Sequence, residues 1–101
     1  MTYTAVVPFV ISISYGSEES FYDMHEMREF DVGATKLGLR GISIIVSSGD
    51  DGVAPRRARW DASQCEYMAM FPSSSGYVTS VGGTQVCFNP SYNRLQEYFF
   101  N

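Results

Sequence analysis

Two adjacent carboxylates, Asp50 and Asp51, lie in the run SSGDDG at residues 47–52, directly after an apolar segment. Gly49 and Gly52 flank them, and glycine lets the backbone turn tightly, so that a carboxylate can project beyond the end of a strand. A carboxyl group placed there can exchange a proton or, when protonated, donate a hydrogen bond to a reacting oxygen. Asp and Gly are also common in ordinary surface turns, which these residues taken alone favour.

A second candidate is the run Ser14, Tyr15 and Gly16, which ends the first apolar segment of the chain. If both apolar segments are parallel strands, this run lies at the same sheet edge as Asp50, the edge where ligands bind in open α/β sheets. The backbone there could pair with an extended peptide as an added strand. The alternative is a plain turn between a strand and a helix.

The remaining polar candidates favour ordinary surface roles. Glu19 and Asp23 lie four residues apart, a spacing at which two carboxylates can share a proton, but solvated residues in the first turn of a helix show the same spacing. His25 is the only histidine and no GxSxG motif accompanies it, so a Ser-His-Asp triad lacks support. No Gly-rich phosphate loop is present, which argues against a nucleotide-binding module. One basic cluster could be a proteolytic processing site or a solvated loop: Arg56, Arg57 and Arg59.

A parallel sheet is needed to hold these candidates in place. Residues 5–14 and 42–46 are rich in Val, Ile and Phe and predict two strands covered on both faces. Between them an apolar stripe at spacings of three and four predicts a helix with Ser17 as its N-cap and Gly41 just past its end. Strand, helix and strand form a right-handed βαβ unit, so the predicted fold class is α/β with a parallel sheet. The stripe consists of Phe21, Met24, Met27, Phe30, Ala34 and Leu37.

Beyond the βαβ unit, residues 53–72 show no clear period and predict a long surface excursion, and residues 77–81 predict a third strand. Residues 86–101 contain aromatic side chains but no period that predicts an element. Cys65 and Cys87 lack metal-ligand spacing, so we expect no metal site; they could pair with each other, pair outside the chain or stay free.

Composition narrows the classes of partner. The chain has 101 residues, 45% of them hydrophobic, which fits one globular domain or a piece of one. A formal net charge of −4 argues against a nucleic-acid partner, which requires dense Lys and Arg. No apolar run approaches the roughly 18 residues of a membrane span, so we expect no membrane partner.

Three sequence blocks, taken together, resemble one protein family. SISYGSEES at 12–20, KLGLRGISIIVSSGDDGV at 36–53 and FPSSSGYVTSVGGTQ at 71–85 resemble the core of the sedolisin family of serine-carboxyl peptidases, in the family's order. The resemblance covers about residues 6–85 and implies a fragment of a subtilisin-like three-layer α/β fold. It divides the chain into a partial catalytic domain at 4–85 and a divergent or poorly ordered stretch at 86–101.

The resemblance also implies roles for single residues. Ser48, Gly49 and Asp50 match the family's SGD block, so Asp50 is expected to complete the oxyanion hole, while Ser14, Tyr15, Gly16, Ser48 and Gly49 are expected to bind substrate. An ionised Asp50 would repel an oxyanion, whereas the neutral acid donates a hydrogen bond to it. An ordinary Asp is neutral only near or below a pH of about 4, so we expect activity in acid.

Other family elements do not match this chain. Thr84 is followed by Gln85 instead of the nucleophilic Ser of the family's G-T-S motif, and Glu19 with Asp23 mimics the family's Glu/Asp pair at the wrong place. The nucleophile is expected downstream, the Glu/Asp pair upstream, and the calcium site of the full-length domain near its C-terminus, with no cofactor in this fragment. We therefore expect the isolated chain to be inactive and marginally stable without the missing parts of its own catalytic domain.

The implied parent is an acid-acting serine-type endopeptidase or tripeptidyl peptidase with peptide or protein substrates, in a lysosomal or extracellular location. The alternative is a non-catalytic remnant that keeps a peptide-binding edge or only the fold.

Overall fold

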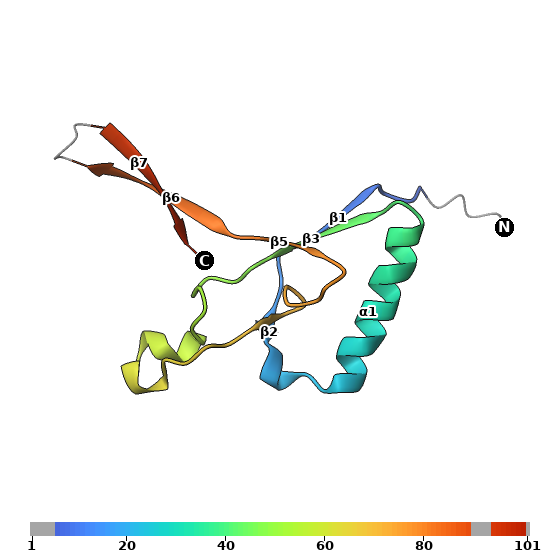
Figure 1. The fold of residues 1–101 in the computed structure, drawn as a ribbon, viewed down its shortest axis with the longest axis horizontal. Helices are drawn as coiled ribbons and strands as arrows, with labels where there is room; N and C mark the ends of the chain where they lie inside the picture. The colour runs from blue at the N-terminus through green and yellow to red at the C-terminus, as the bar shows by residue number, and fades with distance from the viewer. Residues whose placement is uncertain (1–5, 90–93, 101) are drawn as a thin grey trace.

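The computed structural model describes residues 6–89 and 94–100, and its centre is a parallel sheet. The strands β1 (Val10–Ile13), β3 (Ser43–Ser47) and β5 (Thr79–Val81) lie in the order β1-β3-β5. Both pairings are parallel, with Ile13 opposite Val46 and Val46 opposite Ser80 (Figure 1). The predicted α/β class and its three strands are therefore confirmed.

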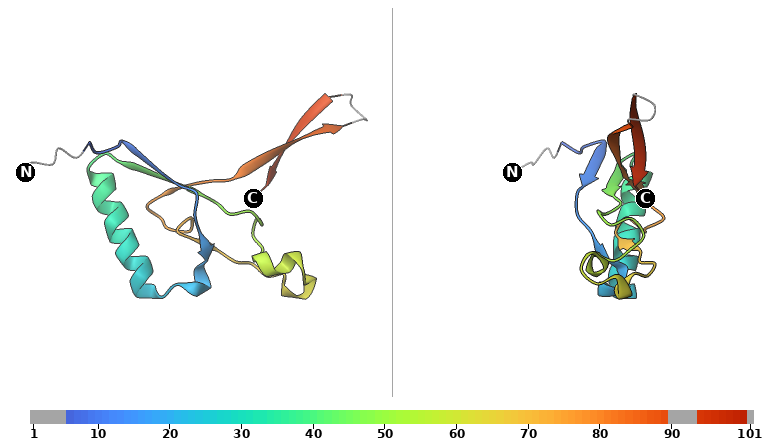
Figure 2. Two further views of the ribbon diagram at one scale, coloured as in Figure 1. Left: turned by 180° about the vertical axis from the view of Figure 1, so that it is seen from behind. Right: turned by 90° about the vertical axis from the view of Figure 1, so that its left-hand side faces the viewer.

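The helix α1 (Met24–Leu39) connects β1 to β3 and covers one face of the sheet (Figures 1 and 2). Ala34, Ile44 and Val46 are buried between the helix and the sheet. Further apolar residues pack around them: Ile13, Phe30, Leu37 and Val78. The central part of the predicted stripe thus forms the core of the βαβ unit, as expected for an amphipathic helix.

The helix begins later than the sequence analysis predicted. Ser17 is not its N-cap but belongs to β2 (Ser17–Glu18), which is followed by the 3-10 helix η1 (Glu19–Phe21). Asp23 is the N-cap: its Oδ1 accepts hydrogen bonds of 2.8 Å from the backbone N–H groups of His25 and Glu26, and Glu26 Oε2 accepts one from Asp23 N–H. The backbone N–H groups of the first helical turn have no partners within the helix, and this capping box supplies partners for them. The helix therefore begins after Asp23 and not at Ser17.

The end of the helix agrees with the prediction. Gly41 has a φ of 79°, in the left-handed region that favours glycine after the last helical turn. The N–H of Ile42 then donates to the carbonyl of Leu37, and the chain enters β3.

The excursion at residues 53–72 contains short elements that the sequence did not reveal. The 3-10 helices η2 (Arg56–Arg59) and η3 (Ala62–Gln64) are followed by β4 (Met70–Phe71). β4 pairs antiparallel with β2, so the far end of the excursion is fixed beside the start of the βαβ crossover.

After the sheet, β6 (Gly83–Asn89) and β7 (Arg94–Phe100) form an antiparallel hairpin that projects away from the rest of the chain (Figures 1 and 2). β6 crosses the boundary expected between residues 85 and 86, and β7 is a regular strand in a stretch where the sequence showed no period. Residues 83–89 pair with residues 94–100 in this ladder, and its backbone hydrogen bonds need no apolar period.

The expectation that the first strand is covered on both faces is also wrong for the described residues. Val10 is 52% exposed and Val81 is 49% exposed, and both lie on the sheet face opposite Ile44 and Val46. The nearly continuous apolar run is typical of a strand that is buried on both faces, but among the described residues only α1 covers the sheet, and it covers one face. None of the described helices has the length and apolar character needed to cross a bilayer.

Candidate functional site

The candidate site is a cavity at the carboxyl ends of β1 and β3. Its volume is about 550 Å³, and the residues that follow both strands line it. Predicted site residues among its lining are Ser14, Tyr15, Gly16, Gly49 and Asp50. The parallel register explains this placement, because it brings the last residues of β1 beside the last residues of β3.

Ser48 is the one predicted site residue that does not line the cavity. Its backbone N–H donates to the carbonyl of Val81 at 3.0 Å, which extends the pairing of β3 with β5. The structure thus places Ser48 in the sheet ladder, next to the site instead of in its wall.

Glycine is required at two positions of the walls. Gly49 has a φ of 101°, and a Cβ atom there would lie 3.2 Å from Met70 Cγ of β4. A Cβ atom at Gly16 would lie 3.1 Å from the carbonyl oxygen of Phe71. Both glycines therefore allow β4 to approach the ends of β1 and β3, and a side chain at Gly49 would in addition be strained.

The two carboxylates of the SGDDG loop have different surroundings. Asp51 binds the guanidinium of Arg59 through both oxygens, with 2.9 Å between Nη2 and Oδ2. This hydrogen bonding raises the pKa of Arg59, partial burial of the guanidinium opposes the change, and the charges of Asp51 and Asp50 add to it. Asp50 is exposed and its carboxyl group accepts no hydrogen bond from the described residues, so it is available to a ligand in the cavity.

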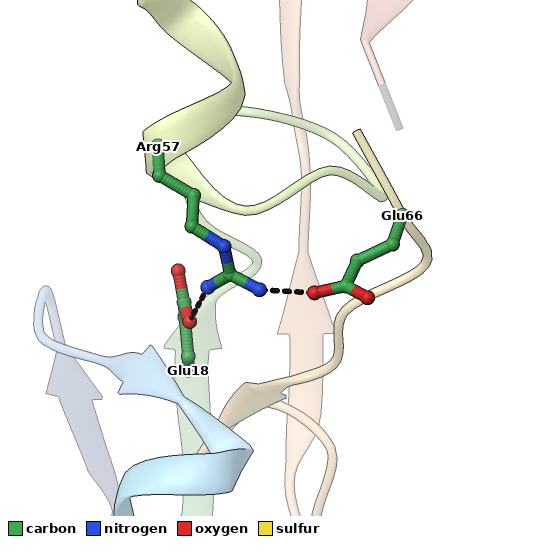
Figure 3. Close-up of polar contacts among 3 residues, drawn as sticks. All are labelled: Glu18, Arg57 and Glu66. Carbon is green, nitrogen blue, oxygen red and sulfur yellow. Dashed lines mark hydrogen bonds and ion pairs between the residues drawn. The ribbon is translucent and has the colours of Figure 1, made fainter. Parts of the chain in front are cut away.

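Arg57 connects the excursion to β2 (Figure 3). Its Nη1 lies 2.6 Å from Oε2 of Glu18, and its Nη2 binds Oε1 of Glu66. Glu18 is 7% exposed and lines the cavity, so the ion pair satisfies a buried carboxylate. Burial alone would lower the pKa of Arg57, but the hydrogen bonds and charges of both glutamates raise it.

Arg56 also lines the cavity but forms a different contact. Its Cζ lies 5.7 Å from the ring centroid of Trp60, a cation–π arrangement. Among the described residues it has no ion pair. The basic cluster of the sequence therefore consists of two structural arginines, Arg57 and Arg59, and one that keeps its charge free.

The other polar candidates do not join the site. Asp23 caps α1, while Glu19 Oε1 lies 3.4 Å from Ser74 Oγ, so the two carboxylates have separate partners and do not form a proton-sharing pair. His25 is exposed and lies 3.8 Å from Glu29 on the same helix. The interpretation of these residues as surface groups is consistent with these contacts.

The sequence analysis missed two ion pairs around the cavity, and one of them joins residues far apart in the chain. Glu18 and Arg57 are 39 residues apart, and no local pattern links them. Arg59 and Asp51 are eight residues apart, across a turn that the sequence did not define. Opposite charges flanking one loop were the only signal of the second pair.

Known proteins match most of this chain in sequence. The chain is 41% identical over 92 residues to tripeptidyl-peptidase SED1 of Arthroderma otae, 38% identical over 87 residues to aorsin of Aspergillus oryzae, and 32% identical over 81 residues to tripeptidyl-peptidase 1 of Homo sapiens. These alignments cover 81%, 76% and 79% of this chain, and 14%, 13% and 14% of the relatives. The chain thus spans about one seventh of the length of the curated relatives it matches.

A solved structure shares the fold. Pseudomonas sedolisin, a serine-carboxyl proteinase complexed with two molecules of pseudo-iodotyrostatin, matches with a TM-score of 0.60 and 26% sequence identity. The match covers 81% of this chain and 23% of that structure's chain. No family model matches the chain.

Proposed function

Since this chain belongs to the sedolisin family of serine-carboxyl peptidases, we propose that it forms part of the substrate cleft of an acid-acting peptidase and supplies the oxyanion-hole residue, Asp50. The observation that carries the proposal is the shared cavity: Asp50 and the run Ser14–Gly16 line the same space at the carboxyl ends of neighbouring strands. Asp50 and this run lie more than thirty positions apart in the chain, and the parallel sheet brings them together.

In this proposal the backbone of Ser14, Tyr15 and Gly16 holds an extended peptide, and Asp50 meets the carbonyl oxygen of the bond to be cleaved. The negative charge that develops on this oxygen is stabilised by a hydrogen-bond donor, and a carboxyl group donates only when it is protonated. Asp51 cannot take this role because both its oxygens bind Arg59. The Asp51–Arg59 pair instead holds the loop that presents Asp50.

The nucleophile and its activating acid pair are proposed to come from residues other than those described. Gln85 follows Gly82-Gly83-Thr84 where a G-T-S motif would have Ser. We therefore propose that residues 1–101 alone hydrolyse no peptide. We also propose that the family's calcium site is formed by other residues, since the described side chains contain no group of three or more His, Cys, Asp or Glu that could hold a metal ion.

The test uses a sedolisin-family peptidase in which residues 6–85 of this chain replace the matching segment. Asp50→Ala should lower kcat by about 10² to 10³, with little change in KM, because one oxyanion donor is lost. Asp50→Asn keeps a hydrogen-bond donor at every pH, so it should retain more activity than the Ala variant. As the pH rises, it should also lose less activity than the chimaera that carries Asp50. Full activity of the Ala variant would exclude the oxyanion role. An inactive parent chimaera that still binds peptide would favour a non-catalytic remnant.

A further inference from the structure

We propose that Arg56 is a specificity-determining residue, which binds an acidic side chain of the peptide in the cavity beside Asp50. The inference rests on the proposed function of this cavity as a peptide cleft. It adds a preference for one chemical class of substrate, peptides with an anionic side chain.

The position of Arg56 carries the first step. Its side chain lines the same cavity as Asp50 and the run Ser14–Gly16, so a peptide bound there passes within its reach. Trp60 holds the guanidinium at 5.7 Å from the centroid of its ring. A guanidinium held by a ring keeps its N–H edge free to form paired hydrogen bonds with a carboxylate.

The charges that line the cavity carry the second step. Glu18 is paired with Arg57, and Asp51 is paired with Arg59. Asp50 must be neutral to donate a hydrogen bond to an oxyanion, which removes its negative charge in the working state. Among the described residues, the charge of Arg56 then remains without compensation in the wall of the cavity.

A free positive charge in a cleft that excludes part of the solvent favours an anion over its neutral isostere. The preferred peptide therefore carries an anionic side chain beside the bond that meets Asp50. It is either a fixed anion such as a sulfonate, or an Asp or Glu whose ionised form the charge of Arg56 favours. The two other arginines of the cluster cannot provide this preference, because their charges are already paired with the carboxylates of Glu18, Glu66 and Asp51.

The experiment measures binding of peptides to the 101-residue chain by the fluorescence of Trp60, the only tryptophan. The peptides are acetylated and amidated pentapeptides, so that no terminal charge contributes. Each pair differs at one position, cysteic acid against Gln, and the position is varied along the peptide. Measured at a pH of about 4, where a sulfonate stays ionised, the acidic peptide should bind about tenfold more tightly for at least one position.

Arg56→Gln should abolish this preference, and Arg56→Lys should retain part of it. Arg28→Gln is the matched control: it removes one positive charge from α1, away from the cavity, and should leave the preference unchanged. Circular dichroism checks that each variant folds, and amide NMR shifts of Gly49 and Gly52 give a second measure of binding that does not depend on Trp60.

Equal binding of the acidic and neutral peptides, or a preference that survives in Arg56→Gln, would overturn the role of Arg56 while leaving the peptide cleft intact. If neither peptide changes the fluorescence or the NMR shifts of a chain that circular dichroism shows to be folded, the cleft itself is refuted and the role of Arg56 with it.

Discussion

Asp50 and Asp51 are neighbours in the chain, yet the loop assigns them different surroundings. Asp51 points to Arg59 and is held by it through both oxygens, while Asp50 lines the cavity and accepts no hydrogen bond from the described residues. A paired carboxylate fixes the loop, whereas an unpaired one is free to contact a ligand in the cavity. One acidic dipeptide can therefore combine an anchor with a reactive group.

Arg57 shows how a single side chain can stabilise the cavity wall. Arg57→Met should destabilise the chain more than Glu66→Gln does, because it leaves the carboxylate of Glu18, 9% exposed at its side chain, without its partner. Glu66 is 57% exposed at its side chain and can be solvated instead. Thermal or urea unfolding at a pH of about 7 measures the difference.

The pH dependence of this effect has a definite sign. The pKa of Arg57 is raised, so its contribution to stability is complete below the ordinary pKa of arginine and is lost only as the pH rises through the raised value. The guanidinium of Arg57 therefore stays charged throughout the acidic and neutral range in which unfolding is measured. Glu18→Gln in the Arg57→Met background should restore much of the stability at neutral pH. A double variant as unstable as Arg57→Met would contradict the assignment of the loss to the buried carboxylate.

At the scale of elements, the N-cap Asp23 fixes where α1 begins after β2 and η1. Asp23→Ala should lower stability by about 1 kcal/mol, because the side chain that accepts hydrogen bonds from His25 and Glu26 is removed. Thermal unfolding followed by far-ultraviolet circular dichroism measures this loss.

Ser17→Ala is the matched control for this prediction, since the sequence pattern favoured Ser17 as the cap but the structure places it in β2. We expect a much smaller change from it, while Asp23→Asn should retain most of the stability because Asn is also a good cap. A larger loss from Ser17→Ala than from Asp23→Ala would move the start of the helix back to residue 17.

The elements that could be predicted from sequence are those whose stabilising contacts repeat along the chain. The stripe that contains Phe30, Ala34 and Leu37 predicted α1, and the apolar run at 42–46 predicted β3. The pairing of β2 with β4 joins Ser17 to Phe71, and such a distant pairing of two-residue strands leaves no periodic signal. The early start predicted for the helix overlooked Asp23 and Glu26, whose spacing of three residues is that of a capping box.

The candidate site also has a part that could be predicted from sequence and a part that could not. That Asp50 and Ser14–Gly16 share an edge follows from parallel strands and was predictable. That Asp51 pairs with Arg59, that Arg57 reaches Glu18, and that Arg56 keeps its charge free depend on how η2 folds back toward the sheet. The sequence contained the cluster of charges, but only the three-dimensional arrangement separates its three arginines.

At the scale of the whole molecule, the chain is extended. The radius of gyration of its Cα atoms is 17.7 Å, whereas a compact domain of this length has about 13 Å. The projecting hairpin β6–β7 and the single helix on the sheet account for the difference (Figures 1 and 2). A sheet covered on one face buries less apolar surface than a three-layer fold, so little hydrophobic free energy stabilises the arrangement.

Exposed apolar residues lie on and beside β1, at an edge of the sheet. It is an outer strand in the order β1-β3-β5, and Phe9 beside it is 84% exposed, Val6 92%. An apolar outer strand with free backbone groups is a template for pairing with another chain. We therefore expect residues 1–101 to unfold over a broad temperature range, to bind a hydrophobic dye and to associate at micromolar concentration.

Phe9→Lys should reduce this association, measured by analytical ultracentrifugation, because a charged side chain beside an outer strand opposes pairing. Tyr67→Lys, which changes an aromatic side chain 90% exposed in the excursion, should not. Association that depends equally on both residues would point to general stickiness of the exposed aromatic residues instead of the strand edge. A sharp two-state melt of a monomer that binds no dye would show that one helix on one face is enough to stabilise this sheet.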